Sequence, residues 1–113
     1  LSVISSAPGK QGHVSGEEAN ALTESRAAKP SHVLLDESGD VGRLYDAKTT
    51  PHMFVIDEQQ QVQYAGAIDN IRSTDPADID TATNYVVAAV GDLDAGNPVA
   101  NAETAPYGCS VKY

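Results

Sequence analysis

The chain has 113 residues, 41% of them hydrophobic and none of them Trp, which suits one domain with a core of aliphatic side chains and a few tyrosines. Its 16 acidic and 7 basic residues give a formal net charge of −9, which argues against nucleic acid and anionic membranes as partners. The single cysteine, Cys109, excludes an internal disulfide and a cysteine-based zinc cluster. No apolar run approaches the ~20 residues of a membrane span.

The first part of the chain predicts a strand, a loop and a helix. The strand covers Leu1–Ser5, and a loop rich in Gly follows it. Ser15 is a good N-cap for the helix, and Glu18 follows three residues later, as a capping box requires. The helix should end before Pro30, because the residue that precedes a proline resists helical geometry.

A short strand is predicted over Ser31–Leu35, and a polar turn follows it. Val41, Leu44 and Tyr45 then lie at helical spacing and predict a helix of two turns.

A hairpin comes next. Pro51 precedes the continuous apolar run Met53–Ile56, which is typical of a strand that is covered on both faces. A polar turn over Glu58–Gln60 leads to Val62–Gly66, where Val62, Tyr64 and Gly66 alternate with other residues as in a half-exposed strand.

The last part of the chain predicts one helix and a tail. Asp75 can cap the helix, and Pro76 suits its first position. A single apolar stripe follows, and Gly96 and Pro98 end the helix. The stripe consists of Ile79, Ala82, Val86, Val90 and Leu93. Residues 97–113 form an extended tail that carries Cys109.

The predicted order is β-α-β-α-β-β-α plus a tail, an α/β layout in a single domain over residues 1–113. Residues 45–57 (YDAKTTPHMFVID) and 66–70 (GAIDN) resemble the second half of thioredoxin-fold redoxins. More narrowly, they resemble the peroxiredoxin-like proteins of the alkyl hydroperoxide reductase and thiol-specific antioxidant group. The ending PYGCSVKY, residues 106–113, resembles the tail of one branch of that group.

The resemblance covers nearly all of the chain but not the family's amino-terminal part, which carries the attacking cysteine. We therefore expect a partial thioredoxin-like fold, a mixed sheet with flanking helices, and a chain that begins at Leu1 as a fragment. The absent strand would be central, so its loss should expose two apolar edges. Either the edges pair with another chain, as in a homodimer, or the strands Leu1–Ser5 and Met53–Ile56 pair directly.

The resemblance also names site residues. The proline that matches Pro51 is cis in this fold, and the exposed backbone of Thr50 pairs with a bound substrate chain. His52 would face the same groove. Cys109 lies between Gly108 and Ser110, as in an accessible turn, and a tail cysteine in this family would resolve a sulfenic acid as a disulfide. A spare thiol is the alternative interpretation of Cys109.

No other pattern predicts chemistry. His13, His32 and His52 lack metal-ligand spacing and are interpreted as surface or partly satisfied histidines. The acidic residues Asp69, Asp75, Asp78 and Asp80 do not match a calcium loop. We therefore expect no metal and no cofactor.

Three functions remain open at this point. The first is the carboxy-terminal part of a thiol oxidoreductase that acts on a peroxide or a protein disulfide and is inactive as this chain alone. The second is a catalytically silent thioredoxin-like binding module, and the third is an unrelated acidic α/β domain. One thiol fits a reducing cytoplasm, the expected location, and also an exported form whose signal has been removed.

Overall fold

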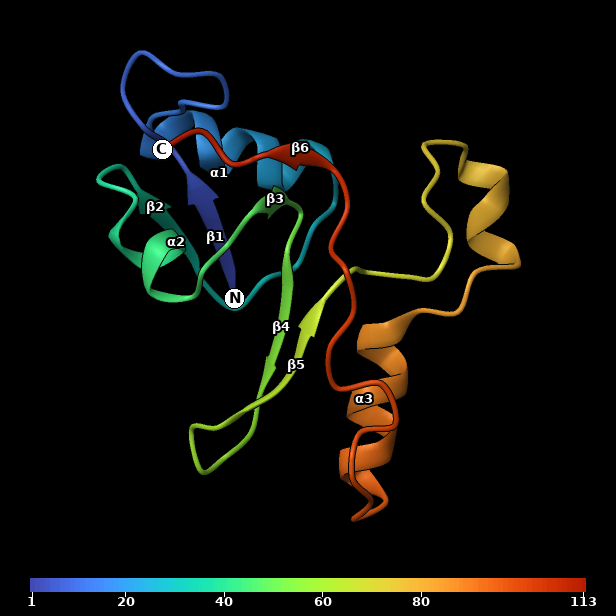
Figure 1. The fold of residues 1–113 in the computed structure, drawn as a ribbon. Coiled ribbons are helices and arrows are strands. Elements are labelled where there is room, and N and C mark those ends of the chain that lie inside the picture. Colours follow the sequence, from blue (N-terminus) through green and yellow to red (C-terminus); the bar gives the residue numbers. More distant parts are fainter. The chain divides into compact units, whose positions relative to one another are not determined.

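A computed structural model describes all residues from Leu1 to Tyr113 (Figure 1). Its elements are β1 (Ser2–Ser5), α1 (Gly16–Ser25), β2 (Val33–Asp36), α2 (Asp40–Leu44), β3 (Thr49–Thr50), β4 (Met53–Ile56), β5 (Val62–Gly66), the 3₁₀ helix η1 (Pro76–Asp80), α3 (Tyr85–Asp94) and β6 (Cys109–Ser110). The α/β class is confirmed, and β3, η1 and β6 are additions to the predicted order. The chain divides into two compact units, residues 1–47 with 111–113, and residues 48–110.

The first unit is built on a parallel strand pair. β1 and β2 pair in register from Ser2 opposite Val33 to Ser5 opposite Asp36. The crossover between them contains α1, as parallel strands require. The predicted capping box is confirmed, because Ser15 accepts the Glu18 N–H and the Glu18 side chain accepts the Ser15 N–H.

The end of the chain also belongs to the first unit. The Tyr113 hydroxyl donates to the Ala47 carbonyl at 2.6 Å, and the Arg43 guanidinium lies 4.6 Å from the centre of the Tyr113 ring. Asp36 is buried, and its carboxylate accepts the N–H groups of Val41 and Gly42 at the start of α2. That carboxylate thereby supplies the acceptor that the short helix lacks.

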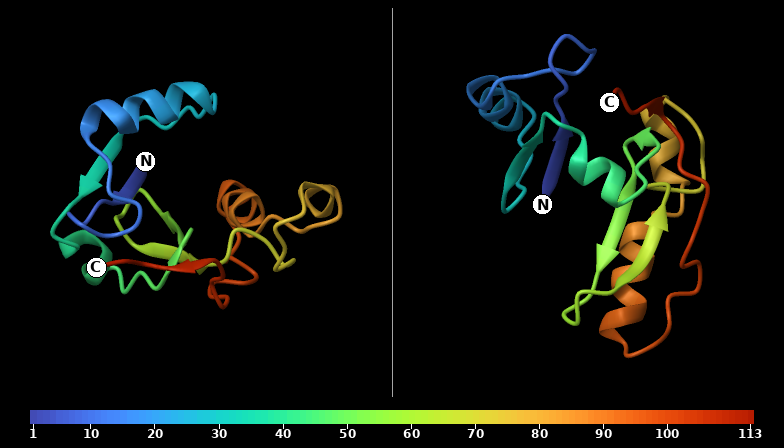
Figure 2. Two further views of the ribbon diagram at one scale, coloured as in Figure 1. Left: turned by 90° about the horizontal axis from the view of Figure 1, so that it is seen from above. Right: turned by 60° about the vertical axis from the view of Figure 1, so that its left-hand side comes forward.

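The second unit is built on the β4–β5 hairpin and α3, which lies beside it (Figure 2). The hairpin is antiparallel, from Met53 opposite Gly66 to Ile56 opposite Val62, with a bulge between Val55 and Ile56. Tyr64 is fully buried and packs against the Tyr85 ring with 6.1 Å between centroids. This tyrosine pair joins the hairpin to the start of α3.

The hairpin turn is stabilised by one carboxylate. Asp57 accepts the N–H groups of Gln59 and Gln61 and the side-chain amide of Gln63. These bonds, the one from Gln61 first, hold the pKa of Asp57 below its ordinary value.

The single helix predicted from Asp75 through Leu93 is wrong. Asp75 does cap a helix with Pro76 inside its first turn, but that helix is the short η1. A second N-cap, Asn84, accepts two N–H groups and starts α3 afresh. The intervening segment, residues 81–84, consists of Thr, Ala, Thr and Asn, which are mostly weak helix formers, and an Asn side chain readily caps a new helix.

The predicted apolar stripe is only partly buried. Ala89 is the buried residue of α3, and Val86 and Leu93 lie half-buried on its side of the helix. Ile79 and Val90 of the stripe are exposed. The stripe does not form one continuous buried face, because it runs across the break at residues 81–84.

Two further expectations about the sheet are corrected. The strands form three two-stranded sheets, β1–β2, β3–β6 and β4–β5, instead of one mixed sheet. Within the two units, β1 pairs with β2 and β4 pairs with β5. β4 is half-buried and its last residue, Ile56, is exposed, so it is not covered on both faces.

Several large apolar side chains remain at the surface. Val3 and Leu34, which are paired across β1–β2, are both exposed, and so are Ile56 and Val62 across β4–β5. The expected association of strand edges with another chain depends on exposed apolar residues of this kind. That association stays a prediction. No helix is long and apolar enough to cross a membrane.

Candidate functional site

The Thr50–Pro51 peptide bond is cis, as predicted. The turn around it is closed by the Thr49 hydroxyl, which donates to the Pro51 carbonyl at 2.7 Å. Thr50 and Pro51 themselves are exposed. The turn therefore lies at the surface of the second unit.

His52 is held by the same turn. Its Nδ1 accepts the Lys48 N–H at 3.2 Å, and its ring stacks on Phe54 with 4.5 Å between centroids. Since Nδ1 accepts a hydrogen bond, the neutral ring carries its proton on Nε2. His52 thus supports the turn with one nitrogen and one face of its ring.

The tail forms a strand along this turn. β6 is antiparallel to β3, with Thr49 opposite Ser110 and Thr50 opposite Cys109. Gly108 makes the approach possible, because a Cβ at this position would overlap the Thr50 carbonyl oxygen and lie 3.3 Å from Cδ of Pro51. Gly108 also has φ +134°, which disfavours any side chain.

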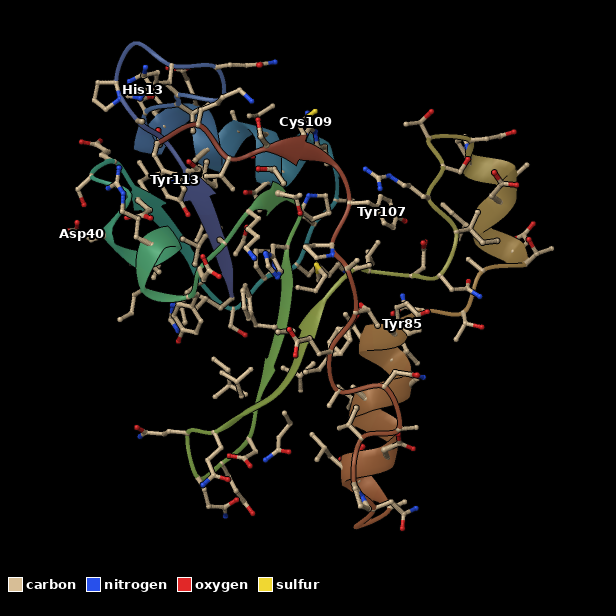
Figure 3. The ribbon with its side chains drawn as sticks, in the orientation of Figure 1. His13, Asp40, Tyr85, Tyr107, Cys109 and Tyr113 are labelled. Carbon is tan, nitrogen blue, oxygen red and sulfur yellow. The ribbon has the colours of Figure 1, made fainter.

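Cys109 is a free, exposed thiol on β6 (Figure 3). It lies across from Thr50, the residue that precedes the cis bond. The structure therefore brings Cys109, Thr50 and Pro51 together, and the sequence alone did not predict that the tail would pair with this edge.

The tail is attached to the hairpin at Thr104. Thr104 N–H donates to Ala65 O, and Ala65 N–H donates to Ala102 O, so the tail runs beside β5. The Thr104 hydroxyl accepts the Ala67 N–H at 3.0 Å and lies 2.6 Å from the hydroxyl of buried Tyr64. A Cβ at Gly66 would overlap Thr104, so glycine is required at this crossing as well.

The tail is attached again at Tyr107, which is labelled in Figure 3. The Tyr107 hydroxyl donates to Asp69 Oδ1, which also accepts the Ile71 N–H. This hydrogen bond to the carboxylate is the main cause that raises the pKa of Tyr107 to about 12. Asp69 was considered in the sequence only for calcium, and Tyr107 was not singled out.

An open cavity of about 310 Å³ is lined in part by Asp69 and Tyr107. The segment after β5, the start of α3 and the tail all contribute to its wall. The lining residues are Ala67, Asp69, Asn70, Arg72, Tyr85, Thr104, Ala105 and Tyr107. The cavity therefore depends on the tail being in place.

Two of the other polar candidates, His13 and Asp75, have structural partners. His13 Nδ1 lies 2.8 Å from the Ser6 carbonyl oxygen, and Asp75 caps η1. Nowhere do three His, Cys, Asp or Glu side chains gather as a metal site would require.

Comparison with known proteins gives structural neighbours without assigned functions. No protein-family model matches the chain, and no curated protein matches it in sequence. It is similar to the crystal structure of an uncharacterized conserved protein from Geobacillus kaustophilus, at 25% identity and a TM-score of 0.80 over 98% of this chain and 57% of that one. A hypothetical protein from Sinorhizobium meliloti is similar at 25% identity and a TM-score of 0.80, over 98% of this chain and 59% of that one. The chain thus spans somewhat more than half the length of these two proteins.

Proposed function

We propose that this chain is the carboxy-terminal part of a thioredoxin-like thiol oxidoreductase, similar to the peroxiredoxin-like antioxidant proteins. The observation that carries the proposal is the position of Cys109, opposite Thr50 and beside the cis bond to Pro51. In this proposal Cys109 is the resolving thiol, and the Thr49–Pro51 turn forms one wall of the groove in which the disulfide forms.

The reaction needs an attacking thiolate that these residues do not contain. That thiolate attacks the terminal oxygen of a hydroperoxide, the O–O bond breaks, and a sulfenic acid and an alcohol form. The Cys109 thiolate then attacks the sulfenic sulfur, an S–S bond forms, and the hydroxyl leaves as water after protonation. An external dithiol reduces the disulfide and is itself oxidised to a disulfide. A reducing cytoplasm is the location that suits this cycle.

The complete protein tests the proposal. With a hydroperoxide and dithiothreitol we expect turnover by the wild type. With the hydroperoxide alone, before any reductant is added, Cys109→Ser should accumulate a sulfenic acid that a dimedone probe traps. Ser110→Ala, which changes the neighbouring exposed residue of β6, is the matched control and should leave turnover unchanged. Absence of turnover above that of free cysteine would contradict the proposal.

A catalytically silent binding module is the second candidate. It is favoured by the single thiol of the chain and by the fact that the Thr50 edge is already paired with the chain's own tail. A complete protein without peroxide or disulfide turnover that still retains a partner through this unit would support the second candidate over the first.

A further inference from the structure

Asp69 stands on a segment that is firmly joined to the start of α3. The Tyr85 N–H donates to Ile68 O at 2.9 Å, and the Asn70 N–H donates to Thr83 O at 3.2 Å. The Asn70 side-chain oxygen accepts the Thr83 N–H at 2.7 Å. Asp69 lies between these bonds and is half-buried, so its carboxylate is a fixed acceptor.

Tyr107 reaches that acceptor from the tail. Its hydroxyl donates to Asp69 Oδ1 across 38 positions of sequence, and Tyr107 and Tyr85 both line the cavity. A hydrogen bond to an ionised carboxylate is stronger than one between neutral groups. Tyr107 is therefore held in place two residues before Cys109.

β6 needs such support, because it pairs over only two residues and is exposed along its length. A strand pair of this size is marginal without further contacts. The Thr104 attachment lies five residues before Cys109, which leaves the intervening backbone free to turn unless a nearer contact holds it. Tyr107 provides the nearer contact.

We propose that Tyr107, through Asp69, is the positioning residue that holds the Cys109 strand against the Thr49–Thr50 edge. The inference rests on the proposed function where it concerns redox chemistry, because the position of Cys109 matters for that chemistry only if Cys109 is the resolving thiol. Without the Tyr107 hydroxyl, Gly108 no longer stays against Thr50, and Cys109 leaves the cis-proline turn for part of the time.

Amide hydrogen exchange of the 113-residue chain, followed by NMR, measures this docking. In Tyr107→Phe we expect the protected amides of β3 and β6 to exchange about tenfold faster or more, since one charged hydrogen bond is lost. The amides of β4 and β5 should keep their protection. Tyr85→Phe is the matched control, because it removes a hydroxyl from another tyrosine that lines the same cavity.

The conservative variant of the acceptor separates positioning from a general loss of structure. Asp69→Asn keeps an oxygen acceptor and should retain most of the protection, whereas Asp69→Ala should lose as much as Tyr107→Phe. The double variant Tyr107→Phe/Asp69→Ala should exchange no faster at β6 than either single variant, because both remove the same bond. Additive losses, or protection at β6 unchanged by Tyr107→Phe, would overturn the inference.

The two proposals fail in different ways. If Tyr107→Phe frees β6 while the complete protein shows no peroxide turnover, the positioning role stands and the proposed function falls. If the complete protein turns over peroxide but β6 protection does not respond to Tyr107→Phe or Asp69→Ala, the positioning role falls and the function stands.

Discussion

Thr50 and Cys109 lie directly opposite each other in the antiparallel β3–β6 pair, and the bond that follows Thr50 is the cis bond to Pro51. The resemblance to redoxins implies that a substrate chain pairs with this backbone edge. In this structure the edge is paired with the chain's own tail, which carries the chain's one thiol. What holds the tail in place therefore decides where the thiol lies.

Gly108→Ala should release β6. The new Cβ would overlap the Thr50 carbonyl oxygen, and φ +134° is strained for alanine, at a cost of about 1–3 kcal/mol. We expect at least tenfold faster amide exchange at β3 and β6. Gly91→Ala in α3, where a Cβ meets nothing within 4 Å, is the control and should stabilise the chain by about 0.5–1 kcal/mol. Unchanged β6 exchange in Gly108→Ala would contradict the close packing at Thr50.

Thr104→Val should destabilise the second unit. The change keeps the shape but removes the hydroxyl that accepts the Ala67 N–H and meets the Tyr64 hydroxyl, so a buried donor loses its partner. We expect the free energy of unfolding to fall by about 1–3 kcal/mol, measured by urea denaturation. Thr74→Val, at an exposed residue of the same unit, should stay within about 0.5 kcal/mol of the wild type. Equal effects of the two substitutions would argue against the Thr104 attachment.

Two of the five tyrosines should ionise late in an alkaline titration that is followed by tyrosinate absorbance. Burial raises the pKa of Tyr64, and the hydrogen bond to Asp69 raises the pKa of Tyr107 from its ordinary 10.0 to about 12. Because the folded-state pKa of Tyr107 is raised, its contribution to stability is complete below pH 10.0 and is lost as the pH rises toward about 12. Tyr107→Phe should remove one of the two tyrosines that ionise at high pH. If the substitution instead removes a tyrosine that ionises near pH 10.0, the hydrogen bond between Tyr107 and Asp69 is contradicted.

The first unit offers an independent test at the carboxyl end of the chain. A Cβ at Gly42 would lie 2.8 Å from the Tyr113 ring, although alanine is otherwise the better helix former. Gly42→Ala should cost about 1–3 kcal/mol by overpacking, and Tyr113→Phe about 0.5–1.5 kcal/mol by losing the bond to Ala47 O. Gly16→Ala, in open space at the start of α1, is the control for urea denaturation. A stabilising Gly42→Ala would mean that Tyr113 does not pack on α2.

Local signals in the sequence predicted the elements that depend on neighbouring residues. The Ser15–Glu18 capping box, the alternation through Tyr64 and the turn before Val62 each operate within a few positions, so one stretch of sequence suffices. The cis bond at Pro51 was predicted from the family resemblance. The break at Asn84 was missed although its capping side chain is a local signal, because the apolar period continued across it.

The contacts that hold the tail were not predictable in the same way. Thr104 meets Tyr64 across 40 positions and Tyr107 meets Asp69 across 38, and no periodicity links residues so far apart. In the sequence Gly66 and Gly108 are ordinary strand and turn glycines. The need for glycine at these positions follows only from the folded structure, in which Thr104 packs on Gly66 and Thr50 packs on Gly108. The candidate site therefore combines residues that the sequence predicted, Thr50, Pro51 and Cys109, with attachments that it did not.

Disulfide formation in Thr50→Cys tests the position of Cys109 most directly. Side chains of directly opposed residues on an antiparallel pair lie on one face, with Cβ atoms about 4.5–5.5 Å apart, close enough for a disulfide after small adjustment. Under mild oxidation at low protein concentration, Thr50→Cys should form an intramolecular disulfide with Cys109, seen as a mass lower by two hydrogens. Thr49→Cys, whose partner is Ser110 and which points to the other face, should not. If the disulfide forms as fast in Thr49→Cys as in Thr50→Cys, or forms in neither variant, the docked position of the tail is contradicted.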